Sequence, residues 1–440
     1  MDYADLRRRS RQHIWHPYTE ITSFEQQDFP IVERAEGSRL YEVDGRVLLD
    51  GISSWWCVNL GHSHPRLVEA IQQQAARLQH TLLGGMSHPA AIELSERLTK
   101  VVPAGLSHAM YASDGSCAVE AALKIALQYW VNQGVAGRTR FITLEDGYHG
   151  DTLGAVSVGY IDTFHRPFLP VLQPALRATS PYCNHCPAHC EPETCQAECF
   201  ASMEVLIREH HRECAAVIVE PLCQAAAGMR IYSSDYLRRL RALCSEYRLP
   251  LIADEIAVGF GRTGAMFACE KAGITPDIMT LGKGLTGGLL PMSATLVTDE
   301  IYDTFRARNG STRTLFHGHT FCGNPIASAV ASAALKVYEE EQVVARLAEP
   351  VRILKNGMRR VAAVLDESPT RSVGMIAAVE IKPSAGGAAL ARRMVQRAYE
   401  LGMFVRPLGS TIYLWPPLNT SQGDLEAMVD IFVRAAQQTA

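Results

Sequence analysis

The sequence predicts an α/β protein with a mostly parallel main sheet and a second, smaller α+β lobe. From about residue 60 to 330, helical stretches alternate with short apolar runs, a pattern typical of parallel strands that are buried on both faces. After residue 330, strand-like runs and helices are grouped apart, as in an α+β lobe. A length of 440 residues also favours two or more lobes over one small core.

Five apolar runs are the candidate strands of the main sheet, and each leads into a polar or glycine-containing loop. They are RFITLEDGYHG (140–150), AAVIVEP (215–221), LPLIADEIAVGF (249–260), DIMTLGKG (277–284) and PMSATLV (291–297). Ligands of parallel sheets gather at the carboxyl ends of the strands, so we expect functional residues in these loops.

The second lobe is predicted to have two helices, at about 326–340 and through 341–365, and a closing helix at the C-terminus. Between them lie the strand-like runs GMIAAVEI (374–381) and FVRPLGSTIYLWPP (404–417). We divide the chain into a large domain, residues 61–330, and a small domain built from both chain ends, residues 1–60 and 331–440.

Composition and charge exclude several functional classes. The formal net charge is −4 and no basic stripe is present, so we expect no nucleic-acid partner, and Arg8–Arg9 is placed on a solvated helix. No apolar run reaches the ~18 residues of a membrane helix, and the N-terminus has no secretory signal. We therefore expect a cytoplasmic protein whose twelve cysteines are mostly reduced thiols.

Lys283 is the strongest candidate for chemistry. It follows an apolar strand and lies between Gly282 and Gly284, so the strand end presents it. Lysine is rarely buried without a function or a partner, and a buried lysine readily becomes a Schiff-base nucleophile. On this fragment alone, a surface lysine in a glycine-rich turn is the competing interpretation.

Asp254 ends the run LPLIAD at what should be the end of a central strand. A carboxylate there needs a cationic partner, and the protonated pyridine nitrogen of pyridoxal phosphate would supply one. A strand-end aspartate that caps the next turn is the common alternative.

The stretch SDGSCAVEAALKIALQYW (113–130) has helical spacing of its apolar residues and begins with Gly115 and Ser116. The free backbone amides at such a helix start form a phosphate cradle. Many helices begin with serine and glycine and bind nothing, so this signal is weak by itself.

GFGRTG (259–264) fits the dinucleotide pattern G-x-G-x-x-G, which would indicate an NAD or FAD enzyme. However, the preceding strand has already ended at Asp254–Glu255, and Arg262 lies within the loop. We prefer a glycine-rich turn that presents Arg262 to an anionic group.

Together these residues resemble the fold-type I, class III pyridoxal-phosphate aminotransferases over essentially the whole chain. IADEIAVGFGRTG and LGKGLTGG, with the spacing from Asp254 to Lys283, are the most specific motifs. HIWHPYT (13–19), DGISSWW (51–56), GYHGDT (147–152), HGHTFCGNP (317–325), VRP (405–407) and YLWPP (413–417) are similar to the 7,8-diaminopelargonate synthases of biotin biosynthesis, which aminate 8-amino-7-oxononanoate. The resemblance implies a seven-stranded, mainly parallel sheet.

The resemblance also implies the cofactor-binding residues and a homodimer. Lys283 would carry pyridoxal 5'-phosphate and shuttle the substrate proton, and Asp254 would pair with the pyridinium. The phosphate would be held by Gly115 and Ser116 with help from Thr320 of the other subunit, beside His319. Tyr148 would stack on the cofactor ring, supported by His149 and Asp151. No metal is implied.

The substrate side implied by the resemblance is a carboxylate clamp with an apolar wall. Arg406 matches the carboxylate binder, with Arg262 as a second candidate, because guanidinium binds carboxylate in a bidentate way. Tyr18, Trp55, Trp56 and Gly318 complete the pocket. Neighbouring residues of an extended segment point to opposite sides, so we expect Trp55 to face the substrate chain and Trp56 to support the loop or form a second wall.

The amino donor stays open between S-adenosylmethionine, which we favour, and lysine. Tyr18 is typical of S-adenosylmethionine users, whereas His319, GLTGGLLP (284–291) and the cysteine-rich insertion resemble the lysine-using branch. Other class III ω-aminotransferases act on ornithine, γ-aminobutyrate or polyamines, and Tyr18 with the paired tryptophans argues against them. A metal-binding or regulatory protein on a retired scaffold is the non-enzyme alternative.

SPYCNHCPAHCEPETCQAECF (180–200) holds five cysteines and two histidines, from Cys183 to Cys199. The spacing C-x2-C-x3-C-x4-C-x3-C fits no standard zinc finger. Three interpretations stay open: a small structural metal site, redox-active thiols, or cysteines that only pack.

Overall fold

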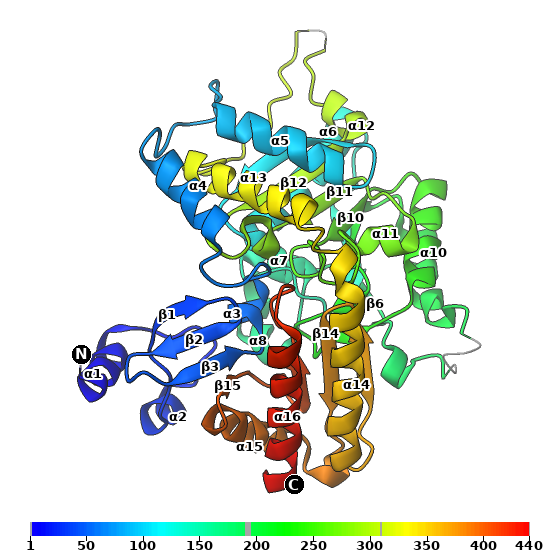
Figure 1. Ribbon diagram of the computed structural model, residues 1–440. Coiled ribbons are helices and arrows are strands. Elements are labelled where there is room, and N and C mark those ends of the chain that lie inside the picture. The colour runs from blue at the N-terminus through cyan, green and yellow to red at the C-terminus, as the bar shows by residue number, and fades with distance from the viewer. Residues whose placement is uncertain (1, 190–194, 309, 440) are drawn as a thin grey trace.

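The computed structural model of the protein describes residues 2–189, 195–308 and 310–439 (Figure 1). Its largest sheet consists of β4 (Leu106–Ala112), β5 (Arg140–Leu144), β6 (Leu176–Ala178), β7 (Cys214–Val219), β10 (Leu251–Asp254), β11 (Ile278–Leu281) and β12 (Ser293–Thr298). The strand order is β4-β12-β11-β10-β7-β5-β6, and only β12 runs antiparallel to its neighbours. The predicted α/β class, with seven strands that are mainly parallel, is confirmed.

The central strands β7, β10 and β11 consist entirely of buried residues, because helices cover both faces of the sheet. Ile218 and Ile252 pack with α6 (Gly115–Asn132) on one face. Their chain neighbours Val217 and Leu251 join the core that includes α10 (Ser234–Glu246) on the other face. This two-sided burial explains why the strands read as continuous apolar runs.

Three smaller sheets complete the fold. β1 (Val32–Glu36), β2 (Arg39–Glu42), β3 (Val47–Asp50) and β15 (Met403–Phe404) form one sheet, β13 (Thr370–Val373), β14 (Ile376–Glu380) and β16 (Thr411–Leu414) form another, and β8 (Cys223–Gln224) pairs with β9 (Arg230–Ile231). β3 pairs in parallel with β15, so the two chain ends share a sheet in the lower half of Figure 1. The division into two domains at residues 60 and 330 stays a prediction.

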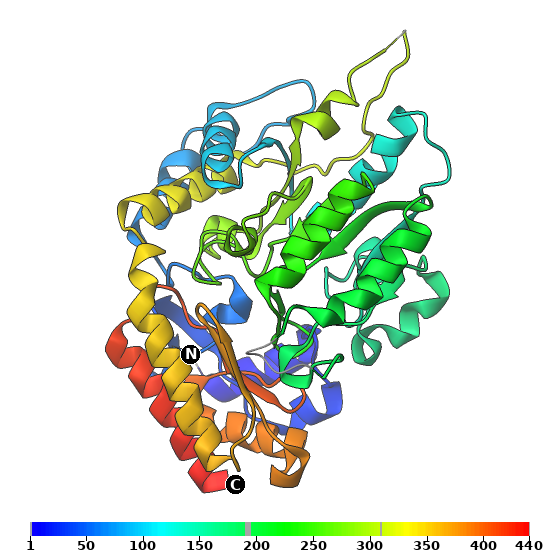
Figure 2. The same ribbon diagram turned by 90° about the vertical axis from the view of Figure 1, so that its right-hand side faces the viewer.

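Six of the longer helices form two groups, one beside the main sheet and one over the C-terminal strands. α4 (Pro65–Ala75), α5 (Pro89–Val101) and α13 (Pro325–Glu340) pack together beside the main sheet, whereas α14 (Ala348–Val364), α15 (Gly387–Glu400) and α16 (Gln422–Thr439) cover the C-terminal strands (Figure 2). The remaining helices are α1 (Tyr3–His13), α2 (Ile21–Gln26), α3 (Ser53–Trp56), α7 (Leu153–Val158), α8 (Asp162–His165), α9 (Ala201–His210), α11 (Ala268–Ala272) and α12 (Asp299–Asp303). Within the described ranges, no helix combines the length and apolarity needed to cross a membrane.

Candidate active site

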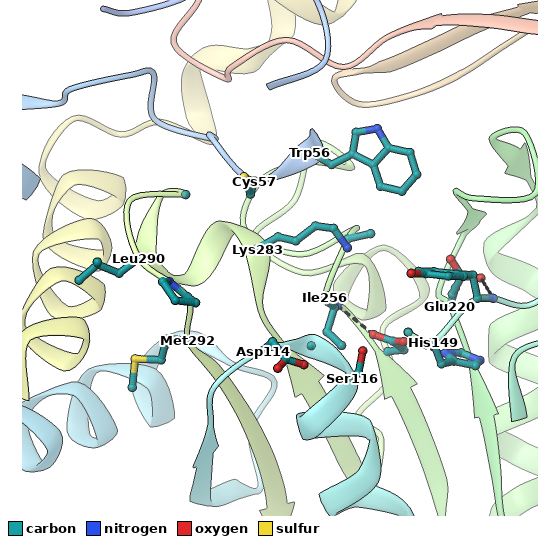
Figure 3. Close-up of a pocket in the computed structure, with 17 residues that line it drawn as sticks. Trp56, Cys57, Asp114, Ser116, His149, Glu220, Ile256, Lys283, Leu290 and Met292 are labelled. Atoms are coloured by element: carbon teal, nitrogen blue, oxygen red, sulfur yellow. Dashed lines mark hydrogen bonds and ion pairs between the residues drawn. The ribbon is translucent and has the colours of Figure 1, made fainter. Parts of the chain in front are cut away.

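A cavity of about 390 Å³ lies at the carboxyl ends of β10 and β11 (Figure 3). Its walls come from several parts of the chain that are distant in sequence. The lining includes Trp56, Gly115, Ser116, Tyr148, Asp254 and Lys283. The loops after the predicted strands therefore meet at one place, as expected for a parallel sheet.

Lys283 follows β11 through Gly282 and begins a single 3-10 turn, Lys283–Thr286. Its side chain runs through the cavity beneath Trp56, with Nζ 5.6 Å from the indole ring centroid (Figure 3). Burial lowers the pKa of Lys283, an effect that the negative charge of Asp254 opposes. A lowered pKa increases the fraction of neutral amine, the form that acts as nucleophile or base.

Asp254 is the last residue of β10 and is 3% exposed. Its Oδ1 accepts hydrogen bonds from Ile256 N and Thr280 Oγ1, both at 3.1 Å. Its Oδ2 lies 2.6 Å from His149 Nδ1. His149 therefore contacts Asp254 and fixes the orientation of that carboxylate.

The start of α6 forms another wall of the cavity. Asp114 caps the helix, since its side chain accepts a hydrogen bond from Cys117 N at 3.0 Å, and Gly115 and Ser116 follow it in the lining. A helix start offers free amides and the positive end of the helix dipole. Gly150 packs so closely here, at φ 119°, that a Cβ would lie 2.2 Å from Ser116 Oγ.

Asp151 joins two tyrosines beside the cavity. Its Oδ1 accepts a hydrogen bond from Tyr18 Oη at 2.6 Å, and its Oδ2 accepts one from Tyr148 Oη at 2.9 Å. Burial and the bond to Asp151 raise the pKa of Tyr18 to about 12, and burial also raises the pKa of Tyr148. Both phenols are therefore protonated donors at neutral pH, and Asp151 supports Tyr148 as expected.

A second cavity of about 610 Å³ shares Trp56, Tyr148 and Lys283 with the first. Its other lining residues include Tyr18, Trp55, Phe164, Leu408, Tyr413 and Arg406. The Arg406 guanidinium carbon lies 4.7 Å from the Trp55 ring centroid, and Tyr18 meets Trp55 edge to face at 5.7 Å. The cavity thus has aromatic walls and a guanidinium that can bind a carboxylate.

The two tryptophans lie in a left-handed turn, so the expectation of an extended segment is wrong. All four residues of α3 have positive φ, between 44° and 74°, and Trp56 N donates a hydrogen bond to Ile52 O at 2.8 Å. Trp55 is 41% exposed, whereas Trp56 is 5% exposed and stacks on Trp415 with centroids 5.2 Å apart. Both residues line the larger cavity, and the Trp56 ring also anchors the turn.

Asp50 stabilises this unusual backbone. Its fully buried carboxylate accepts hydrogen bonds from Ile52 N at 3.2 Å, from Ser54 N at 3.0 Å and from Ser54 Oγ at 2.8 Å. His62 Nε2 lies 2.8 Å from the same carboxylate. Left-handed conformations cost non-glycine residues about 1–2 kcal/mol each, and these bonds offset part of that cost.

Comparison with known proteins identifies the family. The family model described as aminotransferase class III matches residues 22–436. The chain belongs to the class III aminotransferases. An adenosylmethionine-8-amino-7-oxononanoate aminotransferase of Geobacter sulfurreducens is 40% identical over 98% of this chain and 96% of its own length.

Solved structures show the same relationship. The crystal structure of adenosylmethionine-8-amino-7-oxononanoate aminotransferase from Methanocaldococcus jannaschii matches with a TM-score of 0.93 at 35% identity, covering 100% of both chains. A pyridoxal-phosphate-bound amine transaminase from an uncultivated Pseudomonas species matches with a TM-score of 0.90 at 32% identity, covering 97% of this chain and 99% of that one.

Class III aminotransferases use pyridoxal phosphate, and this aminotransferase is a pyridoxal-phosphate-dependent enzyme. The smaller cavity fits that cofactor. A lysine amine, a buried carboxylate and the start of a helix all line it, matching the aldehyde, the pyridine nitrogen and the phosphate of the cofactor. Tyr148 supplies an aromatic wall for the ring.

Arg262 does not line either cavity, so the expectation that it faces an anionic group or substrate carboxylate is wrong. The side chain is fully buried. Nη1 donates to Pro416 O at 2.6 Å, and Nη2 donates to Asn59 Oδ1 at 2.8 Å. The guanidinium carbon lies 5.0 Å from the Trp415 ring centroid, on which Trp56 stacks. Arg262 thus supports Trp415 and, through it, Trp56.

Replacing Arg262 by methionine should lower the free energy of unfolding by about 3 kcal/mol, because buried acceptors lose charged hydrogen bonds. Urea unfolding measures this loss, and both half-reactions should weaken together. Arg360→Met is the matched control, since Arg360 pairs with Asp430 at 2.8 Å on the surface and should change stability little. If Arg262→Met had normal stability and lost only oxo acid binding, Arg262 would be a carboxylate-binding residue.

Gly318, His319 and Thr320 also do not line either cavity of a single chain. Gly318 and Thr320 are exposed and His319 is half-buried, on the loop before α13. The resemblance implies that Thr320 reaches the site from the other subunit, and the roles of all three residues stay predictions.

Glu220 is a site residue that the sequence analysis missed. It follows β7, lines the smaller cavity and is 5% exposed. Burial raises the pKa of Glu220 to about 7, opposed by the charge of His149. Its oxygens accept hydrogen bonds from Tyr148 N at 3.0 Å and Ala225 N at 3.2 Å. The signal was present, because this glutamate ends an apolar run just as Asp254 does.

The cysteine-rich insertion is described only in part, and Cys190 lies outside the described residues. Its described part docks on the C-terminal strands: His185 Nε2 lies 3.2 Å from Glu380 Oε2, and Asn184 Nδ2 donates to Thr370 O at 3.1 Å. Over the described ranges, no group of three or more ligand side chains could hold a metal ion. Burial raises the pKa of Cys199 to about 12, which disfavours the thiolate that redox chemistry needs.

Proposed function

We propose that the aminotransferase converts 8-amino-7-oxononanoate to 7,8-diaminononanoate with S-adenosylmethionine as amino donor. The observation that carries this proposal is the pair of cavities that share Lys283, the larger of which combines aromatic walls with Arg406. This arrangement suits a long apolar chain that reacts at one end and bears a carboxylate at the other. Relatives at 40% and 35% identity bear the corresponding name.

The residues of the site divide the work of transamination. Bound pyridoxal phosphate supplies an electron sink that stabilises negative charge at the substrate carbon. Lys283 Nζ takes the proton from that carbon and returns it, because it lies in both cavities and burial lowers its pKa. Asp254 holds negative charge for the pyridine nitrogen, and Tyr148 forms a wall beside the ring. Arg406 orients the oxo acid through its carboxylate.

We also propose a homodimer in which Thr320 of one protomer reaches the site of its partner, with Gly318 and His319 beside it on the same loop. Phe316 and Phe321 on the same loop are 88% and 61% exposed. Large exposed aromatic side chains that cluster on one loop are typical of an interface.

The most direct test follows the cofactor absorbance of the purified enzyme. S-adenosylmethionine should bleach the yellow aldehyde form in a single turnover, and 8-amino-7-oxononanoate should then restore it. If lysine bleaches the aldehyde form instead, lysine is the amino donor and 8-amino-7-oxononanoate remains the acceptor. If only ornithine or γ-aminobutyrate reacts, the proposed function fails.

Replacing Arg406 by alanine should raise the concentration of 8-amino-7-oxononanoate needed for half-maximal rate by about 10²-fold, since a charged hydrogen-bonding pair is lost. The oxo acid half-reaction, measured from the amine form, gives this value. Arg406→Lys should recover part of the loss because the charge returns without the planar fork. An equal loss in the donor half-reaction would contradict the carboxylate role.

A further inference from the structure

An ion pair lies in the larger cavity in addition to Arg406. Arg230 Nη1, on β9, lies 2.7 Å from Asp146 Oδ2. Asp146 is two residues after the end of β5 and two residues before Tyr148, with φ at 56°. Both side chains line the larger cavity and are partly open, 26% exposed for Arg230 and 38% for Asp146.

Asp146 is the only carboxylate among the described residues that line this cavity. Two permanent cations, Arg230 and Arg406, share the lining with it. Among the described lining residues, Asp146 is therefore the one that attracts a positively charged ligand group, with an energy that exceeds that in open water. The pair with Arg230 uses Oδ2, and no hydrogen-bond partner of Oδ1 is found within the described ranges.

The two arginines occupy different surroundings. Arg406 contacts Trp55 and the Tyr18 backbone, with Nη2 3.4 Å from Tyr18 O. Arg230 is paired with Asp146 and lies 5.4 Å from the Tyr182 ring centroid. Ala226, Ala227 and Gly228, which precede β9, also line the cavity and leave room beside the pair. Among the described residues Arg406 has no carboxylate partner and can bind an anion, whereas the pair presents an oriented carboxylate.

The two substrates of the proposed reaction differ in where they carry positive charge. The oxo acid carries its ammonium on the carbon next to the reacting one, so this charge stays close to Lys283. Both donors considered carry a positive group several bonds away from the reacting carbon, a sulfonium in S-adenosylmethionine or an ammonium in lysine. Asp146 lines the larger cavity and not the smaller one that holds Asp254 and the helix start, so its charge can serve the distal group of the donor.

We propose that Asp146, held in place by Arg230, is the subsite that binds the distal cationic group of the amino donor. This inference rests on the proposed function, because it assumes that the aminotransferase uses a cationic amino acid as donor. The ion pair contributes little to folding, since partly exposed pairs are typically worth under about 1 kcal/mol. Its place in the cavity is the feature that needs a functional explanation.

Matched ligand pairs isolate the charge. S-adenosylhomocysteine lacks the sulfonium charge of S-adenosylmethionine, and norleucine lacks the distal ammonium of lysine. For each ligand we would measure, on the holoenzyme, the concentration that gives half-maximal change of the cofactor absorbance. The wild-type enzyme should prefer the charged member of the donor pair by about tenfold or more, and Asp146→Asn should remove most of that preference.

Three variants make the result unambiguous. Asp146→Glu should recover part of the preference, and Arg230→Gln should weaken it by releasing the carboxylate. Asp430→Asn, which removes a surface pair with Arg360 at 2.8 Å, should leave the preference at the wild-type value. Thermal unfolding of each variant confirms that the comparison is made on folded protein.

The inference is overturned if Asp146→Asn keeps the wild-type preference in both the S-adenosylmethionine and the lysine arm, or if it weakens charged and neutral ligands equally. The ligand pair for which the wild-type enzyme prefers the charged member identifies the amino donor. Failure of the proposed function looks different, because the wild-type amine form would then not be reoxidised by 8-amino-7-oxononanoate, whatever the variants do.

Discussion

Lys283→Ala should reduce transamination by at least about 10⁴-fold, the upper range of a single acid-base residue, because the same amine carries the cofactor and moves the proton. Lys283 lines both cavities and is the only lysine among their described lining residues, so no other primary amine there can substitute for it. Single-turnover measurement of each half-reaction gives the loss. Wild-type protein treated with borohydride should keep its cofactor covalently, and the variant should not.

Lys283→Arg is the control for charge, since it keeps a cation on a long side chain but holds its proton at any accessible pH. It should be as inactive as the alanine variant while it folds normally. If either variant retained a cofactor colour that borohydride fixes, another amine would be the attachment point and the assignment of Lys283 would be lost.

Asp254→Asn should lower the rate by about 10²–10⁴-fold, corresponding to the ~3–5 kcal/mol lost when one partner of a buried charge pair is neutralised. Asparagine keeps the size of the side chain and an oxygen that can accept from Ile256 N and Thr280 Oγ1, so the fold should be preserved. What is lost is the negative charge opposite the pyridine nitrogen. Rates of both half-reactions at saturating substrate measure the effect.

Asp277→Asn provides a matched control in the same sheet. Asp277 precedes β11 and pairs with Arg241 at 2.6 Å, at the end of the strand opposite the cavity. Its neutralisation should lower stability and leave the saturated rates unchanged. Similar rate losses in the two variants would show that Asp254 acts through folding alone.

The strands of the main sheet were predictable where both faces are buried. β7, β10 and β11 read as apolar runs because helices cover them on both sides. β4 was missed because Ser107 is exposed and His108 only half-buried, and β6 because it has three residues. The antiparallel direction of β12 depends on how distant connections cross, which no local pattern contains.

The site was predictable where one side chain ends a strand. Lys283, Asp254 and Tyr148 stand after apolar runs, and the structure brings them to one cavity. Arg262 was misplaced because the glycine-rich turn carries no information about which way its arginine points. Only the packing of distant residues, such as Asn59, makes it a buried support.

The left-handed turn has a consequence for how substrate range can change in this enzyme. Backbone geometry, set by Asp50 beneath the turn, aims both indoles at once. Mutations at Trp55 or Trp56 can shrink or enlarge the wall but cannot redirect it. Substitutions at the tryptophans themselves should therefore change the substrate range gradually. Substitutions at Asp50 or His62 should change it abruptly, because one change tilts both rings together. Libraries that randomise only cavity-lining positions would never sample the second kind.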